Sequence, residues 1–158
     1  MTPGGPHAIL VALDESERQV QVFATAMQVA RRAGAKVVLI RVLTVPLQIP
    51  PGAHTVPDGL EAKLVKATEA ELRGLMATAP DVAFGASLVV FDGAPWRRIV
   101  EAGKALDTDL IVVGNHRHHG LDRVFESVAS KVVNHTDRDV LVVRVRETGR
   151  DATGVRAH

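Results

Sequence analysis

The chain contains no cysteine, and this absence excludes disulfide bonds, thiolate catalysis, zinc ribbons and iron–sulfur clusters. Aromatic residues are also scarce, since they make up 3% of the 158 residues, whereas 46% are hydrophobic. The core must therefore consist mainly of valine, leucine, isoleucine and alanine. A core of such aliphatic residues is typical of a parallel sheet that is covered by helices.

Neither sign of charge dominates, because 19 basic residues stand against 18 acidic ones. The chain therefore has no electrostatic field that would recruit nucleic acid or an anionic membrane, and we expect neither as a partner. No apolar run approaches the roughly 20 residues of a membrane span. The first six residues lack the basic and apolar regions of a signal peptide, so we expect a cytoplasmic protein.

Short apolar runs alternate with segments of helical periodicity along the chain. The apolar runs predict strands at 8–13, 36–42, 87–91, 109–114 and 139–144. The periodic segments predict helices from Ser16 to Gly34, from 60 to 77, from 95 to 106 and from 121 to 132. This alternation predicts one α/β domain at 7–146 with a doubly wound parallel sheet, between a flexible N-terminus at 1–6 and a loose tail at 147–158.

Some helix signals name individual side chains. Ser16 and Gln19 have the spacing of a capping box, so Ser16 is predicted to cap the first helix. The predicted inward positions of the other three helices are Leu60, Leu64, Leu72, Leu75, Ile99, Val100, Gly103, Leu106, Leu121, Val124, Val128 and Val132.

The segment that follows the fourth predicted strand carries the clearest functional signal. It begins at Gly114, ends at Gly120 and holds basic or titratable side chains between them. Glycine permits positive φ angles and lets a ligand approach the main chain closely. Free N–H groups in such a loop, beside a helix N-terminus, favour an anion such as phosphate. The alternative is an ordinary connection that needs glycine only in order to turn.

Several short motifs occur together in one order: Val11 to Ser16, Asp92 to Pro95, Ile99, Asp109 to Gly114, Ser127-Val128 and the valine-rich last strand. In this order they resemble the universal stress protein family over roughly residues 7–146. The resemblance implies an open five-stranded sheet in the order 3-2-1-4-5 with helices on both faces, a Rossmann-like fold of the adenine nucleotide alpha hydrolase-like type. Ligands in open α/β sheets bind at the carboxyl ends of the strands flanking the switch point, here the first and fourth strands.

The resemblance also implies a function. We expect a small stress-response regulatory protein that binds ATP or a related adenine nucleotide, with or without Mg²⁺, at this switch point. In the family position Asp14 would accept a hydrogen bond from the adenine or ribose, and Val42 would offer its backbone to the adenine. The expected site residues are Asp14, Val42, Val113, Gly114, His116, Arg117, Glu126, Ser127 and Val128.

Two departures from the family motif leave an alternative open. Nucleotide-binding members have glycines where this chain has Arg117 and Glu126, although Gly114 and Ser127 match. A carboxylate about 4 Å from a phosphate costs about 1 kcal/mol in water and about 4 kcal/mol at an effective dielectric of about 20. The alternative is an interaction module of the same fold that has lost nucleotide binding.

Catalysis beyond weak ATP hydrolysis is not expected, and neither is a metal site built from protein ligands alone. The chain has no P-loop motif and no Gly-x-Ser-x-Gly motif, and no general base or activated nucleophile can be named. His116, His118 and His119 lack cysteine, aspartate or glutamate at ligand spacing inside their loop, so we expect solvent-facing histidines.

The last strand predicts a homodimer. Val140, Val142 and Val143 belong to a strand that is apolar on both faces, yet the topology places it at the sheet edge. An apolar edge strand invites aggregation unless it is covered or paired, and pairing with a twofold mate would satisfy its free backbone groups. The alternative is that the tail folds over this edge. A protein partner that the sequence does not name is also compatible with a regulatory role.

Overall fold

The computed structural model describes residues 4–44, 59–91, 93–115 and 127–146. Five parallel strands form one sheet in the order β3-β2-β1-β4-β5. The strands are β1 (Ala8–Ala12), β2 (Lys36–Leu43), β3 (Phe84–Phe91), β4 (Leu110–Asn115) and β5 (Asp139–Arg144). The predicted fold class and strand order are confirmed, so β1 and β4 flank the switch point.

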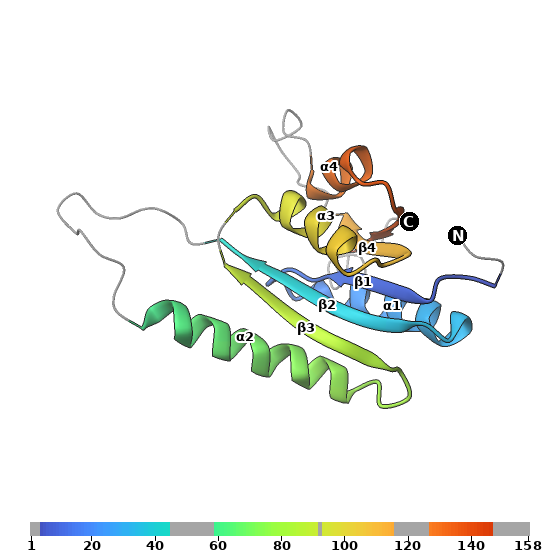
Figure 1. Cartoon of the computed structure of the whole chain (residues 1–158). Helices are drawn as coiled ribbons and strands as arrows, with labels where there is room; N and C mark the ends of the chain where they lie inside the picture. The colour runs from blue at the N-terminus through green and yellow to red at the C-terminus, as the bar shows by residue number, and fades with distance from the viewer. Residues whose placement is uncertain (1–3, 45–58, 92, 116–126, 147–158) are drawn as a thin grey trace, which may run out of the picture.

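Four helices cover the two faces of the sheet (Figure 1). They are α1 (Gln19–Ala33), α2 (Leu60–Ala77), α3 (Pro95–Ala105) and α4 (Val128–His135). The alternation of side chains along β2 divides the core, because successive residues of a strand point to opposite faces. Val37 and Leu39 pack with α1 and α2, whereas Val38 and Ile40 pack with α3 and α4.

The start of α1 differs from the prediction. The Ser16 hydroxyl does not cap the helix but donates to Asp14 Oδ1 at 2.6 Å, and the Ser16 N–H donates to the same oxygen at 2.9 Å. Arg18 occupies the N-cap position without a side-chain cap. An aspartate two residues upstream offers the serine a local turn that competes with helix capping. The capping-box prediction is therefore wrong, whereas the predicted stop at Gly34 is confirmed by its φ of 63°.

The bounds of α2 are as predicted, but its apolar face is only partly used. Leu72 is fully buried and Leu75 packs against the core, whereas Leu60 and Leu64 are 37% and 39% exposed. Thr68, which lies between Leu64 and Leu72, is the other buried residue of α2. The buried and packed positions of α2 therefore run from Thr68 to Met76, and the first two leucines precede this stretch.

The inward faces of the last two helices are confirmed in part. Ile99 is buried, whereas Leu106 follows the end of α3 and is 41% exposed. Val132 of α4 is fully buried, and Val128 at its first turn is 42% exposed. Two other predicted positions, Leu121 and Val124, lie outside the described residues, as do residues 1–3 and the tail 147–158. No described helix has the length and apolar character needed to cross a bilayer.

Polar side chains join the amino ends of neighbouring strands. Asp109 Oδ2 accepts hydrogen bonds from the backbone N–H groups of Ala8, at 2.9 Å, and His7, at 2.7 Å. These two bonds hold the pKa of Asp109 below its usual range. Arg138 Nη1 donates to Asp107 Oδ1 at 2.7 Å, which joins the start of β5 to the turn before β4. This end of the sheet is therefore closed by charge-assisted hydrogen bonds.

Candidate functional site

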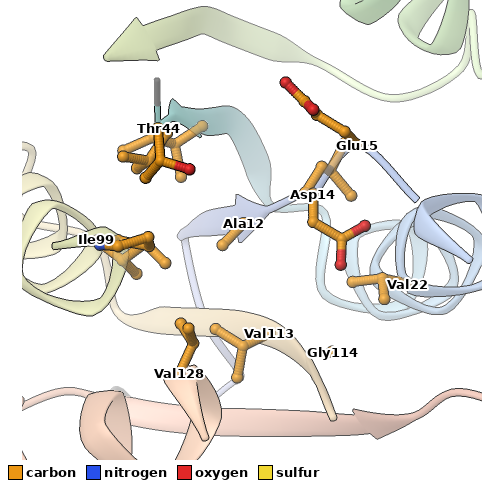
Figure 2. Close-up of a pocket in the computed structure, with 13 residues that line it drawn as sticks. Ala12, Asp14, Glu15, Val22, Thr44, Ile99, Val113, Gly114 and Val128 are labelled. Carbon is orange, nitrogen blue, oxygen red and sulfur yellow. The ribbon is translucent and has the colours of Figure 1, made fainter. Parts of the chain in front are cut away.

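A cavity of about 280 Å³ lies at the carboxyl end of the sheet, where the strand order reverses. Its walls come from the ends of β1, β2 and β4, from α1 and from the first turns of α3 and α4. Figure 2 shows Ile99, Val113 and Val128 lining one part of the cavity, with Asp14 and Glu15 across from them. The cavity thus combines an apolar wall with a carboxylate-bearing rim.

The structure brings together five of the predicted site residues around this cavity: Asp14, Val42, Val113, Gly114 and Val128. These residues lie on four different elements or their ends, and only the fold makes them neighbours. Of the other four predicted residues, only Ser127 is described. His116, Arg117 and Glu126 lie outside the described residues.

Ser127 is described but does not line the cavity. It borders a smaller hollow of about 170 Å³ that Asn115, Ser130 and Val142 also line. Its hydroxyl oxygen accepts a hydrogen bond from the Ser130 N–H at 3.1 Å and so caps α4. The hydroxyl is engaged by its own helix, and the next residue, Val128, reaches the cavity in its place.

Gly114 lines the cavity and keeps only one of the two roles predicted for it, the close approach of a ligand to the main chain. It lies within β4, paired with Val143 of β5, and is not among the glycines with positive φ. The predicted turn at this glycine is wrong, because the strand continues to Asn115. What glycine contributes here is the absence of a side chain at the cavity wall.

Asp14 and Glu15 form the carboxylate-bearing rim at the end of β1. Asp14 is held in place through Oδ1, which accepts the two hydrogen bonds from Ser16. Glu15 makes no hydrogen bond or ion pair within the part of the chain that the structure describes. Glu15 was not among the predicted site residues, and the signal for it in the sequence was its position directly after Asp14.

The described lining offers binding surface but no catalytic set. Among its described residues Thr44 supplies the only hydroxyl, and none is histidine, lysine or arginine. The described residues also contain no group of three or more His, Asp or Glu side chains placed to hold a metal ion. An apolar cavity with a few polar groups at one side is the usual form of a small-molecule site.

Comparison with known proteins assigns the chain to a family. The model of the universal stress protein family matches residues 6–144. The chain belongs to this family. Universal stress protein A homolog 1 of Coxiella burnetii is 29% identical over 141 residues, which cover 88% of this chain and 96% of that protein.

Solved structures of universal stress proteins share the fold. A universal stress protein in complex with cAMP has a TM-score of 0.67 at 23% identity, with 89% of this chain and 98% of that chain covered. The universal stress protein from Archaeoglobus fulgidus in complex with dAMP has a TM-score of 0.59 at 22% identity, with 86% and 96% covered. These similarities extend over nearly the whole of each chain.

A partly buried charge cluster lies on the other face of the strand that carries Val42. Arg41, next to Val42 in β2, is 1% exposed and donates hydrogen bonds to Glu71 of α2 and Gln19 of α1. Gln19 Nε2 also donates to Glu71 Oε1 at 3.0 Å. These bonds, chiefly the one from Arg41, hold the pKa of Glu71 below its usual range.

This cluster links α1 and α2 beneath the site of this universal stress protein. It explains why Gln19, expected as a helix-capping partner, points inward and is buried. The cluster was not predicted from the sequence, although a charged residue within an apolar strand was a signal for it. Arg41 interrupts the run from Val37 to Leu43, in which the other odd-numbered positions are apolar and buried.

Proposed function

We propose that this universal stress protein is a small stress-response regulator that binds an adenine nucleotide in the cavity at the carboxyl ends of β1 and β4. One observation carries the proposal: the residues that the family resemblance marks for nucleotide binding, Asp14, Val42 and Gly114, line a single cavity. The relatives crystallised with cAMP and with dAMP support the same ligand class.

In the proposed complex the adenine lies against the apolar wall formed by Ile99 and Val113. Asp14 accepts a hydrogen bond from the ribose or the base, and the backbone of Val42 contacts the adenine edge. ATP, with or without Mg²⁺, is one member of the proposed ligand class. We further propose binding without turnover, since the described lining supplies no activated nucleophile. The cytoplasmic location expected from the sequence stays a prediction.

Equilibrium dialysis with labelled adenosine, AMP, cAMP and ATP tests the proposal. Wild-type protein should show saturable binding of at least one of them, and Gly114→Val should abolish it by filling the cavity wall. Gly74→Val is the matched control, because it adds the same side chain to α2 at a position with no neighbour within 4 Å. Absence of binding by wild-type protein at millimolar ligand would refute the proposal.

An interaction module without a nucleotide is the second candidate function. The Ser127 hydroxyl favours it, because its single O–H donor is directed to Ser130 Oγ at 3.2 Å and not to a ligand. Arg117 and Glu126 replace family glycines, and Glu126 adds both charge and bulk. If this candidate is right, wild-type protein binds no nucleotide and Glu126→Gly creates binding.

We also propose that the protein is a homodimer through β5, the last strand in the sheet order. Val142 is 39% exposed on this edge strand and Val140 is half-buried, whereas Val143 packs inside the core of its own chain. Val142 therefore carries the proposed contact. Sedimentation equilibrium should give twice the monomer mass.

A variant pair tests the dimer contact. Val142→Asp should shift the protein toward monomer, because a charge would be buried in the interface. Val20→Asp is the control, since Val20 is 55% exposed but lies on α1. A wild-type monomer at tens of micromolar protein would contradict the proposal.

A further inference from the structure

Glu15 is the least explained polar group of the cavity. It lines the cavity beside Asp14, yet within the described residues no side chain or backbone group pairs with it. Figure 2 shows the two carboxylates leaving the end of β1 in different directions, with that of Asp14 toward Val22 and that of Glu15 away from it. One carboxylate is therefore fixed locally by Ser16, whereas the other is left at the rim.

We propose that Glu15 determines ligand specificity by charge, so that the cavity prefers adenine ligands of low negative charge to ATP. This inference rests on the proposed function and names the ligand class for the same site. Adenosine, with no phosphate, should bind best, cAMP with its single phosphodiester charge should follow, and ATP should bind most weakly.

The charge distribution of the lining supports this order. Asp14 and Glu15 are both exposed acidic residues, and the described lining contains no basic side chain to offset them. A triphosphate brought to this rim would meet a carboxylate that pairs with no cation among the described residues. Like charges placed opposite each other are a common means of rejecting the wrong ligand, and they act on the difference between affinities.

The size of the cavity points the same way. Ligand pockets usually measure about 300 to 1,000 Å³, and this cavity of about 280 Å³ lies just below that range. It has room for a base and sugar, so a chain of phosphates would extend beyond the cavity, whose rim carries Asp14 and Glu15. Neutral or singly charged ligands place little or no negative charge near this acidic rim.

Isothermal titration of wild-type protein and Glu15→Gln, in buffer with EDTA, tests the inference. Glu15→Gln keeps the shape of the side chain and removes its charge. It should tighten ATP binding by about fivefold to tenfold and cAMP binding by about twofold, and it should leave adenosine binding unchanged. The gain for ATP should shrink between about 50 mM and about 500 mM salt, because exposed charges are screened.

Glu17→Gln is the matched control. Glu17 is exposed two residues further along the same segment and does not line the cavity, so its variant removes the same net charge elsewhere. An equal gain in ATP affinity from Glu17→Gln would overturn the inference, because the effect would then belong to the whole chain. Equal changes in adenosine and ATP affinity on Glu15→Gln would also overturn it, since they would show that the shape of the side chain matters and not its charge.

The outcomes separate this inference from the proposed function. Wild-type protein that binds ATP as tightly as adenosine, with no change in Glu15→Gln, would end the role of Glu15 and leave nucleotide binding intact. ATP binding that occurs only in Glu15→Gln would support the role of Glu15. No binding of any of these ligands by either protein would end both.

Discussion

The two ends of the sheet use acidic side chains in opposite ways. At the amino end Asp109 accepts two backbone hydrogen bonds and Asp107 pairs with Arg138, so these carboxylates fasten strands to one another. At the carboxyl end Asp14 is held by its own segment, and Glu15 has no partner in the described part of the chain. Carboxylates that join elements should therefore contribute to stability, whereas the carboxylate at the rim should contribute to ligand selection.

Glu71 lies toward the carboxyl end of the sheet but is paired, so it tests whether pairing or location decides the role of a carboxylate. Its substitution should have the largest effect on stability. Glu71 forms an ion pair with Arg41 near the carboxyl end of β2, and we expect its contribution to stability to come from this pair. Glu71→Gln leaves Arg41 buried without its counter-charge. We expect the free energy of unfolding to fall by about 2 kcal/mol, less than the about 3 to 5 kcal/mol for a fully buried pair, because the Glu71 side chain is 48% exposed.

Urea denaturation of Glu71→Gln and of a control measures this effect. Glu69→Gln makes the same change on the same helix at a residue outside the cluster, and it should stay within about 0.5 kcal/mol of wild type. Equal, small effects of the two substitutions would show that the pairing of Arg41 adds nothing.

Asp109→Ala should give the next largest effect, about 1 to 2 kcal/mol at pH 7, because two backbone N–H groups lose their acceptor. The pKa of Asp109 is lowered by folding, so its contribution is present above its ordinary pKa of about 3.9 and is lost as the pH falls through the lowered value. The difference between wild type and variant should therefore shrink in acid. Denaturation at neutral and acid pH measures it, with exposed Asp139→Ala as the control.

Ser127→Ala tests whether a residue at the carboxyl end serves the helix or a ligand. Loss of the cap on α4 should lower stability by about 1 kcal/mol, and Ser127→Thr should restore most of it. Adenosine affinity should not change, because Ser127 does not line the cavity. If Ser127→Ala instead weakened adenosine binding and left stability unchanged, Ser127 would serve the ligand and not the helix.

Glu15→Gln should have the smallest effect on stability, within about 0.5 kcal/mol of wild type at pH 7. The reason is that no partner within the described residues loses a bond when the charge is removed. Thermal unfolding without ligand provides the measurement. A large loss would mean that Glu15 joins elements in the same way as Asp109.

The features that depend on periodicity were predictable from the sequence. The bounds of α2 follow from an apolar pattern without competing signals, and Pro95 marks the start of α3 because proline suits the first helical position. The strand order came from the family resemblance together with the alternation of elements. These signals are strong because many residues contribute to each.

The features that depend on single side chains were harder to predict. The Ser16 hydroxyl can either cap the helix or hydrogen-bond to Asp14, and sequence spacing alone does not show which interaction is more favourable. Ser127 and Val128 are neighbours in sequence, but the helix start turns one toward its own backbone and the other toward the cavity. Arg41 and Glu15 required the positions of α2 and of the strand ends, which only the assembled fold supplies.

The walls of the cavity come from residues as distant in sequence as Asp14, Val42, Ile99 and Val113. No single strand–helix unit contains the site, so its contacts have high contact order and form only when the chain has folded as a whole. A ligand in the cavity therefore binds the native state and not the unfolded chain. By mass action it raises the stability of the entire domain, by about 2.7 kcal/mol at a hundred times its Kd, and makes the melting temperature a direct report of occupancy.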